Sequence, residues 1–289
     1  MCSACDKHYP VIDGVPVLIN EDNSVFRIAD YAGHAGYEGA SGHGGALDSS
    51  KGLRRLYRRF TSGLSNLSIG HAGFPLSAAI EHVRQQCPDA AVLVVGAGDE
   101  TYEGPGFVYT DVAFGRNVAC ICDSHDLPFP DSSFDLVILI SVLEHVVDPY
   151  RCVAEVTRVL RPAGFVYAVT PFLQPVHMRA HDFTRFTYLG HRRLFRAFDD
   201  IQSGTAGGPG NTLAHVARYA LLSLSDNRRT RSLLRLMGLI LTLPLRYADY
   251  LLDRKKASYD AAWSVFFFGR RRTEPIPDRE ILALYRGGP

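Results

Sequence analysis

The sequence feature that most constrains the fold is a series of short, almost wholly apolar runs between residues 91 and 172. The segment 148–161, which precedes the last of these runs, carries apolar residues at helical spacing instead. Strands that are apolar on both faces and alternate with helices indicate a parallel sheet covered on both sides. We therefore predict an α/β fold. The apolar runs read AVLVVGAGD, FVYTDV, VACICD, FDLVILI and GFVYAVTPF.

The C-terminal third predicts helices and one further strand. We expect a short helix over 190–198, a glycine-rich loop over 204–210 and helices over 211–256. The run AAWSVFFFGRRR, residues 261–272, has a strong β propensity. Because this run arrives last, after a helical excursion, we predict that it forms an antiparallel strand at the edge of the sheet.

The N-terminal region predicts a hairpin followed by a linker. Asp13-Gly14 lies between two apolar stretches in YPVIDGVPVLI, which is the signal of a tight hairpin turn. Residues 21–50 are rich in Gly, Ser and His, and 51–87 carry helical spacing. The expected organisation is a hairpin over 1–20, a linker over 21–50, a main domain over 51–272 with a helical insertion at 211–256, and a tail over 273–289.

Composition and charge narrow the class of protein. The 289 residues carry 31 Lys and Arg against 30 Asp and Glu, and 46% of them are hydrophobic. This balance excludes a disordered chain and gives no support to nucleic-acid binding. Six cysteines without a regular framework and the lack of an apolar leader predict a reducing, cytoplasmic location.

A glycine loop and two acidic residues follow the predicted strands. Gly96 and Gly98 come directly after the first strand, where small residues let a backbone turn tightly or approach a ligand. Asp111 and Asp123 end the next two strands, either as turn caps or as partners of a ligand. Strand ends of this kind meet at one edge of the sheet, so a ligand site is predicted there. Thr101 and the short spacing to Asp111 count against a nicotinamide dinucleotide site.

Several motifs in this order resemble the class I S-adenosylmethionine-dependent methyltransferases, and most closely the type 11 methyltransferase domain. They are VLVVGAGD, DSHDLPFPDSSFDLV, VLEHVVDPYRCVAEVTRVLRPAG and FVYAVTPF, and together they cover residues 90–172. The resemblance implies a seven-stranded, Rossmann-like sheet and S-adenosylmethionine (SAM) as cofactor. Two departures from the family pattern are Glu100, which replaces a glycine, and a shortened helix after it.

The resemblance also implies roles for individual residues. The glycines would face the methionine end of SAM, Asp111 the ribose, and Asp123 with Ser124 the adenine. The loop after the fourth strand would lie beside the cofactor and the acceptor. The cofactor residues implied are Gly96, Gly98, Asp111, Asp123, Ser124, Ser141 and Glu144.

The segment PFLQPVHMRAHDFTRFT, which follows the fifth strand, is rich in titratable side chains. In the fold implied here it overhangs the acceptor pocket, where a His or Asp can accept a hydroxyl proton. The alternative is a polar lid whose charges pair with one another. The candidate catalytic residues are His145, His177, His181 and Asp182.

The N-terminal CSACDKHYPVIDGVPVLI resembles the second half of a short zinc ribbon found with methyltransferases. Tetrahedral zinc needs four ligands, and only Cys2 and Cys5 show the spacing of a ligand pair. We therefore expect no bound metal.

The basic and apolar stretch 215–256 has two interpretations. It is either a helical lid packed on the sheet or a helix that lies on a membrane surface, because Arg and Lys alternate with Leu runs. Its longest uncharged apolar run, 236–245, is too short to span a bilayer, which takes about 20 residues.

The function predicted from these observations is SAM-dependent methyl transfer to a hydroxyl of a glycan, a lipid-linked acceptor or a small metabolite. The alternatives are a SAM-binding partner or regulator without catalysis and, less favoured, a nicotinamide-dependent oxidoreductase.

Overall fold

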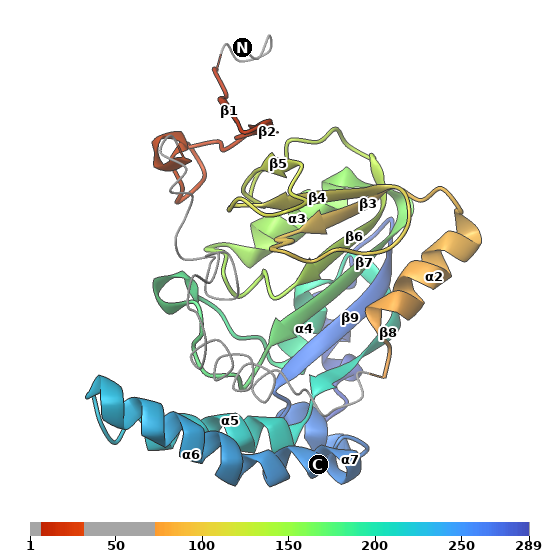
Figure 1. The fold of residues 1–289 in the computed structure, drawn as a ribbon. Coiled ribbons are helices and arrows are strands. Elements are labelled where there is room, and N and C mark those ends of the chain that lie inside the picture. The colour runs from red at the N-terminus through yellow and green to blue at the C-terminus, as the bar shows by residue number, and fades with distance from the viewer. Residues whose placement is uncertain (1–6, 32–72, 289) are drawn as a thin grey trace.

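A mostly parallel sheet of seven strands forms the centre of the computed structural model, which describes residues 7–31 and 73–288 (Figure 1). The strand order is β5-β4-β3-β6-β7-β9-β8, and β9 runs antiparallel to both of its neighbours. The predicted fold class is thus confirmed. The strands are β3 (Val92–Val95), β4 (Phe107–Asp111), β5 (Cys120–Ile121), β6 (Phe134–Ile140), β7 (Leu160–Pro171), β8 (Phe198–Gly207) and β9 (Ser264–Arg271).

Helices cover both faces of the sheet, as the apolar strands predict. In β3, Leu93 and Val95 pack with α3 (Pro149–Val159) and α4 (Tyr188–Leu194). The alternate residues Val92 and Val94 face the other way and pack with α2 (Leu76–Gln86). Successive side chains of a strand point to opposite faces, so a strand between two helical layers must be apolar throughout. Figure 1 shows α2 on one side of the sheet and α3 and α4 on the other.

The structure corrects two predictions at one end of the sheet. Much of the expected loop 204–210 belongs to β8, which continues to Gly207, and β8 rather than β9 is the edge strand. The antiparallel direction of β9 was predicted correctly. The glycines stand opposite large rings: a Cβ on Gly204 would lie 3.0 Å from Phe266, and one on Gly207 3.0 Å from Trp263. They therefore make room inside a strand instead of ending it.

The predicted hairpin is present at the N-terminal end. Its strands are β1 (Val11–Ile12) and β2 (Val15–Pro16), and Asp13 and Gly14 both have positive φ, 49° and 81°. This is the backbone that a tight two-residue hairpin turn requires. Residues 7–31, here called the N-terminal arm, end in the short 3₁₀ helix η1 (Ile28–Tyr31). The described residues do not include Cys2 and Cys5, nor residues 32–72, which hold most of the expected linker and of the segment with helical spacing.

The arm continues onto the edge of the large sheet. Val17 forms a parallel bridge with Ile121 of β5, and the N–H of Leu18 donates to the Ile121 carbonyl over 2.7 Å. Near the end of the arm, the Tyr31 hydroxyl donates to the carbonyl of Val112 over 2.7 Å. The arm therefore forms an extra rim beside β5.

The helical region after β8 consists of two long helices and one short one. They are α5 (Pro209–Leu222), α6 (Arg228–Tyr247) and α7 (Asp249–Leu252), which lie together at one end of the molecule (Figure 1). Among the described residues, no helix is both long and apolar enough to cross a membrane. The chain then passes through the 3₁₀ helix η4 (Lys256–Asp260) into β9 and ends in α8 (Asp278–Ile281) and η5 (Leu282–Leu284).

Candidate cofactor and acceptor site

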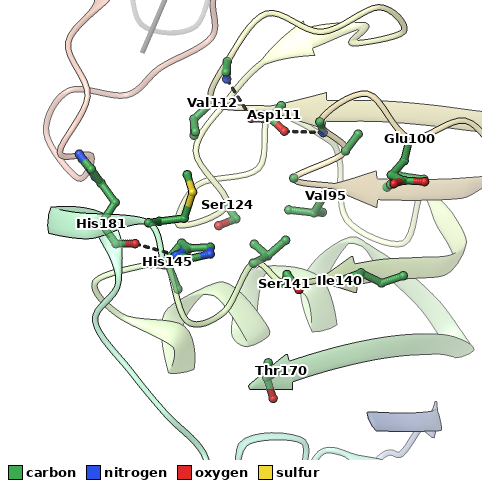
Figure 2. A pocket seen from close by; sticks show the side chains of 18 of the residues that line it. Val95, Glu100, Asp111, Val112, Ser124, Ile140, Ser141, His145, Thr170 and His181 are labelled. Carbon is green, nitrogen blue, oxygen red and sulfur yellow. Dashed lines mark hydrogen bonds between the residues drawn. The ribbon is translucent and has the colours of Figure 1, made fainter. Parts of the chain in front are cut away.

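A cavity of about 1130 Å³ opens at the carboxyl ends of β3, β4, β6 and β7 (Figure 2). This is the edge at which open α/β sheets bind their ligands. Every predicted site residue lines the cavity except Glu144 and Asp182, which lie against the histidines of its wall. The topology thus gathers residues that are up to 86 positions apart, from Gly96 to Asp182.

The glycine loop after β3 needs its glycines for two different reasons. Gly96 and Gly98 both have positive φ, 64° and 55°. A Cβ on Gly96 would lie 2.5 Å from Cγ2 of Val142, so this position has no room for a side chain. A Cβ on Gly98 would meet nothing within 4 Å among the described residues. Gly98 therefore leaves open space at the cavity, where a ligand can approach the backbone.

Asp111, at the end of β4, joins two loops at the cavity wall. Its Oδ2 accepts the N–H of Gly98 over 2.7 Å, and its Oδ1 accepts the N–H of Ala113 over 2.9 Å (Figure 2). Burial raises the pKa of this carboxyl, although these backbone bonds act against the rise. Each carboxylate oxygen can accept about two hydrogen bonds, so Asp111 keeps acceptor capacity for two hydroxyls.

Asp123, at the end of the segment after β5, connects the N-terminal arm to the cavity. Its Oδ2 accepts the hydroxyl of Ser24 over 2.5 Å, and its Oδ1 contacts Nδ1 of His125 over 2.6 Å. Burial alone would raise the pKa of Asp123, but hydrogen bonds from His125 and Ser24 outweigh it and hold the pKa below its usual value. The hydroxyl of the adjacent Ser124 lies 3.2 Å from the Cys152 sulfur, which leaves its backbone for ligand contacts.

The loop after β6 begins with a strained residue. Ser141 has a φ of 54°, in the left-handed region that residues other than glycine rarely adopt. Its N–H donates to the carbonyl of Val169 over 3.0 Å. Backbone strain of this kind is often found at binding and catalytic sites. In the same loop, the carbonyl of Glu144 accepts the N–H of Phe183 over 2.7 Å, which ties this loop to the polar segment after β7.

The Glu144 side chain is fully buried, and neither of its oxygens has a hydrogen-bond partner among the described residues. Burial raises its pKa to about 8, against a lowering by the nearby charge of Arg185. Its Oε1 lies 3.6 Å from Nε2 of His145 and 3.6 Å from Nε2 of His177. A buried carboxyl is therefore set between two imidazoles at the wall of the cavity.

The two histidines are held by their other ring nitrogens. Nδ1 of His145 lies 2.7 Å from the carbonyl oxygen of His181, the bond drawn in Figure 2. Nδ1 of His177 lies 3.3 Å from Oδ2 of Asp182. Burial lowers the pKa of His145, so its neutral form is favoured. The rings meet edge to face with centroids 4.6 Å apart.

Asp182 and His181 act on this pair in different ways. Asp182 accepts hydrogen bonds from the guanidinium of Arg185 and from the N–H of His177, and these outweigh burial to lower its pKa. It is thus placed to orient His177 rather than to face the cavity. His181 contributes its carbonyl to His145, while its ring stacks on Phe26 of the arm at 6.1 Å.

Sequence reasoning missed several residues of the wall. Thr170 at the end of β7 and Ser264 at the start of β9 line the cavity, and their hydroxyls have no hydrogen-bond partner among the described residues. The same holds for the indole N–H of Trp263. Phe26 of the arm also lines the cavity. Thr170 and Ser264 could have been predicted, because they are polar residues at the ends of apolar runs. No motif in the sequence indicates that Phe26 of the arm reaches this site.

These observations test whether the chain fits SAM. Open space at Gly98 gives room for a ligand against the backbone, and Asp111 has acceptor capacity for a pair of ribose hydroxyls. The unpartnered polar atoms of Thr170, Trp263 and Ser264 suit a ligand with polar groups at the other end. The residues present therefore fit the cofactor.

Comparisons with known proteins agree with this fit. A family profile described as "Methyltransferase domain" matches residues 109–168. Ubiquinone/menaquinone biosynthesis C-methyltransferase UbiE of Hahella chejuensis is 26% identical over 148 residues, which cover 48% of this chain and 59% of that protein. The protein of the same name from Bordetella avium is 31% identical over 120 residues, which cover 40% and 46%.

A solved structure of Haemonchus contortus phosphoethanolamine N-methyltransferase 2 with SAM covers 78% of this chain and 61% of that chain, with 14% identity and a TM-score of 0.41. A likeness of that size carries no argument about this chain. The chain spans about half the length of the curated relatives it matches.

The family match and the seven-stranded sheet confirm the resemblance found in the motifs. Residues 109–168 of the chain therefore match a methyltransferase domain, and the lining of the cavity beside them fits SAM as the cofactor.

Proposed function

We propose that this protein transfers a methyl group from SAM to an acceptor that enters the same cavity beside His145 and His177. The observation that carries the proposal is the continuity of the cavity. It runs from the glycine loop and Asp111 to the two histidines and Thr170 without a break. A cofactor and an acceptor bound there would face each other.

When bound, SAM supplies a methyl group on a sulfonium sulfur. The chain's own residues then have mainly to align the acceptor and exclude water, because methyl transfer is an in-line displacement. Gly96 and Gly98 let the backbone approach the methionine end, and Asp111 accepts the ribose hydroxyls. Asp123 and the backbone of Ser124 border the adenine, and Ser141 and Glu144 lie toward the acceptor.

The acceptor atom is proposed to be a hydroxyl oxygen of a glycan, a lipid-linked sugar or a small metabolite. Such a hydroxyl gives up its proton as it attacks. The imidazole of His145, whose neutral form is favoured by burial, can accept it, and the imidazole of His177 lies beside it. Asp182 orients His177, and the His181 carbonyl orients His145. Thr170 and Ser264 offer hydroxyls that can bind a second polar group of the acceptor.

Carbon methylation is the second candidate, because the curated relatives are named as C-methyltransferases of ubiquinone and menaquinone biosynthesis. The same histidines could remove a proton from a ring hydroxyl next to the carbon. Transfer of a ¹³C-labelled methyl group separates the two outcomes, since the product's methyl signal in an NMR spectrum differs strongly between O–CH3 and C–CH3.

The helices α5 and α6 are proposed to touch a membrane surface from the cytoplasmic side, which would suit a lipid-linked acceptor. Apolar side chains of α6 are exposed, with Leu233 at 59%, Ile240 at 58% and Leu241 at 62%. Arginines at the start of the same helix would favour anionic headgroups. Sedimentation with anionic and neutral vesicles at low salt tests this part. Equal sedimentation of Leu241→Asp and the parent protein would remove it.

Binding and turnover together test the main proposal. Isothermal titration with SAM should show binding, and Asp111→Ala should weaken it by about 1.5–3 kcal/mol, the range for hydrogen bonds to a charged group. The matched control Asp89→Asn removes an exposed acid that does not line the cavity and should bind SAM as the parent does.

Equal affinity in a folded Asp111→Ala protein would contradict the cofactor assignment. SAM binding without methyl transfer to any acceptor in a cell extract would favour the non-catalytic alternative.

A further inference from the structure

We propose that Glu144, His145 and His177 bind a divalent transition-metal ion at the acceptor end of the cavity. One carboxylate oxygen and two imidazole nitrogens come from two loops, those after β6 and β7. Their candidate ligand atoms all lie within 4.8 Å of one another. The expectation of no metal rested on the cysteines, and this site uses none of them.

The distances between the ligand atoms suit a metal ion. Oε1 of Glu144 lies 3.6 Å from Nε2 of each histidine. In a tetrahedral site with bonds of about 2.1 Å, neighbouring ligand atoms are about 3.4 Å apart. Small side-chain shifts would therefore bring all three ligands to bonding distance of one ion. The remaining coordination positions would face the cavity, where water or an acceptor could occupy them.

The ring nitrogens are already assigned as a metal site requires. Nδ1 of His145 faces a carbonyl oxygen, which can only accept, so Nδ1 carries the proton and Nε2 keeps its lone pair. Nδ1 of His177 lies 3.3 Å from Oδ2 of Asp182 without forming a hydrogen bond, and a small ring rotation would let it donate to that carboxylate. Metal-binding histidines characteristically donate their second N–H to a carbonyl or carboxylate.

Glu144 supplies the independent reason to expect a cation. Its carboxyl is fully buried without a hydrogen-bond partner among the described residues. The nearby Arg185 is committed to Asp182 by bonds from both terminal nitrogens. A buried carboxylate without a partner is costly, and a bound cation would remove that cost.

The donor set selects the kind of ion. Two imidazoles and one carboxylate suit Mn²⁺, Fe²⁺, Co²⁺ or Zn²⁺, whereas Mg²⁺ and Ca²⁺ prefer oxygen ligands. An ion there would bind an acceptor oxygen and make its proton easier to remove. It would take over the part given to the imidazoles of His145 and His177 in the proposed function, because their Nε2 lone pairs would then be bound to the ion. This last consequence rests on the proposed function, but the metal site itself does not.

The test is a titration of the full chain, stripped with a chelator, with Co²⁺. We expect one equivalent to bind, with visible absorption bands of a nitrogen and oxygen site and no thiolate-to-cobalt band. Glu144→Gln and His177→Ala should each weaken binding at least 10-fold. Asp182→Asn, which leaves the three ligands in place, should weaken it about 10- to 100-fold by releasing His177.

Two controls exclude sites elsewhere. His8→Gln removes an exposed histidine, and Cys5→Ser removes a thiol from the N-terminal pair; neither should change the affinity or the spectrum. The far-ultraviolet circular dichroism of every variant should match that of the parent and so show that each is folded.

No binding of Co²⁺, equal binding in the ligand variants, or loss of binding in Cys5→Ser would overturn the metal site. In that case Glu144 and the histidines would share protons instead. The proposed function would stand as long as SAM binding and methyl transfer persist.

Discussion

At the scale of single residues, the two glycines of the loop after β3 allow two destabilising effects of a Gly→Ala substitution to be measured separately. One is the strain of a positive φ, and the other is the collision of the new Cβ with a neighbouring side chain. Gly96 and Gly98 share a positive φ, but only Gly96 faces a side chain, that of Val142. Gly98→Ala should therefore lower the free energy of unfolding by about 1 kcal/mol through backbone strain alone. Gly96→Ala should cost more, because its Cβ also collides with Val142.

Adding Val142→Ala to Gly96→Ala removes the methyl group with which the new Cβ collides. The double variant should be more stable than the sum of the two single effects predicts, by about 1 kcal/mol. Urea denaturation of the four proteins measures this coupling. Strict additivity would mean that the loop moves away from Val142 at little cost.

A second residue, His191 of α4, makes stability depend on pH. Its side chain is 1% exposed among aromatic rings, and burial, with the charge of Arg192, lowers its pKa to about 3. The unfolded chain, with a pKa near 6.5, binds the proton more readily between pH 6.5 and 3. The free energy of unfolding should therefore decrease as the pH is lowered, by about 2 kcal/mol from this residue between pH 7 and pH 5.

His191→Phe should remove that part of the acid sensitivity. Denaturation midpoints of both proteins at pH 7 and pH 5 provide the measurement. An unchanged difference between the two pH values in the variant would assign the acid sensitivity to other groups.

At the scale of elements, α5 depends on an acid from another helix. Its first residues follow Gly208, which offers no side-chain cap. The Asp249 side chain of α7 takes the place of the missing cap. It accepts the N–H groups of Gly210 over 2.6 Å and Asn211 over 2.9 Å. A carboxylate at a helix N-terminus also faces the positive end of the helix dipole.

Asp249→Ala should thus lower the free energy of unfolding by about 2–3 kcal/mol and loosen α5. Asp226→Ala, in the exposed connection between α5 and α6, is the control and should change stability by less than about 0.5 kcal/mol. Thermal unfolding compares the two. Similar losses of stability in both variants would contradict the role of Asp249 as the cap of α5.

The elements also show what the sequence could and could not predict. The strands buried between helical layers were predictable because nearly every residue is apolar, as in FDLVILI, where Asp135 is the one polar residue. β8 was missed because FDDIQSGTAG reads as a polar, glycine-rich loop, and its glycines matter only opposite the rings of Phe266 and Trp263. Likewise, Glu144 was placed beside the cofactor, but its meeting with His177 depends on how two loops fold back.

At the scale of the whole molecule, the N-terminal arm and the cofactor cavity are coupled. Phe26 lines the cavity, and Ser24 bonds to Asp123 in the proposed adenine border. A ligand held there should stabilise the docked arm, because release of the arm would also remove part of the site. Trypsin cleavage after the exposed Arg27 should slow by up to about 100-fold at a SAM concentration of 100 times Kd.

Cleavage after Arg228, at the far end of the helical region, is the internal control and should keep its rate. Mass spectrometry of the fragments over time follows both sites in one experiment. If SAM leaves the rate after Arg27 unchanged, the arm and the cofactor site are independent.

The hydrogen bond between Leu18 and Ile121 also affects the tendency of the protein to aggregate at high concentration. Exposed strand rims recruit strands from other molecules and so begin aggregates. Here the arm occupies the carbonyl of Ile121 through the N–H of Leu18. If the arm detached, the edge of β5 would be exposed to other molecules of the protein. The arm thus shields this strand edge, and we expect a protein whose arm detaches to aggregate more readily as well as to lose part of its cofactor site.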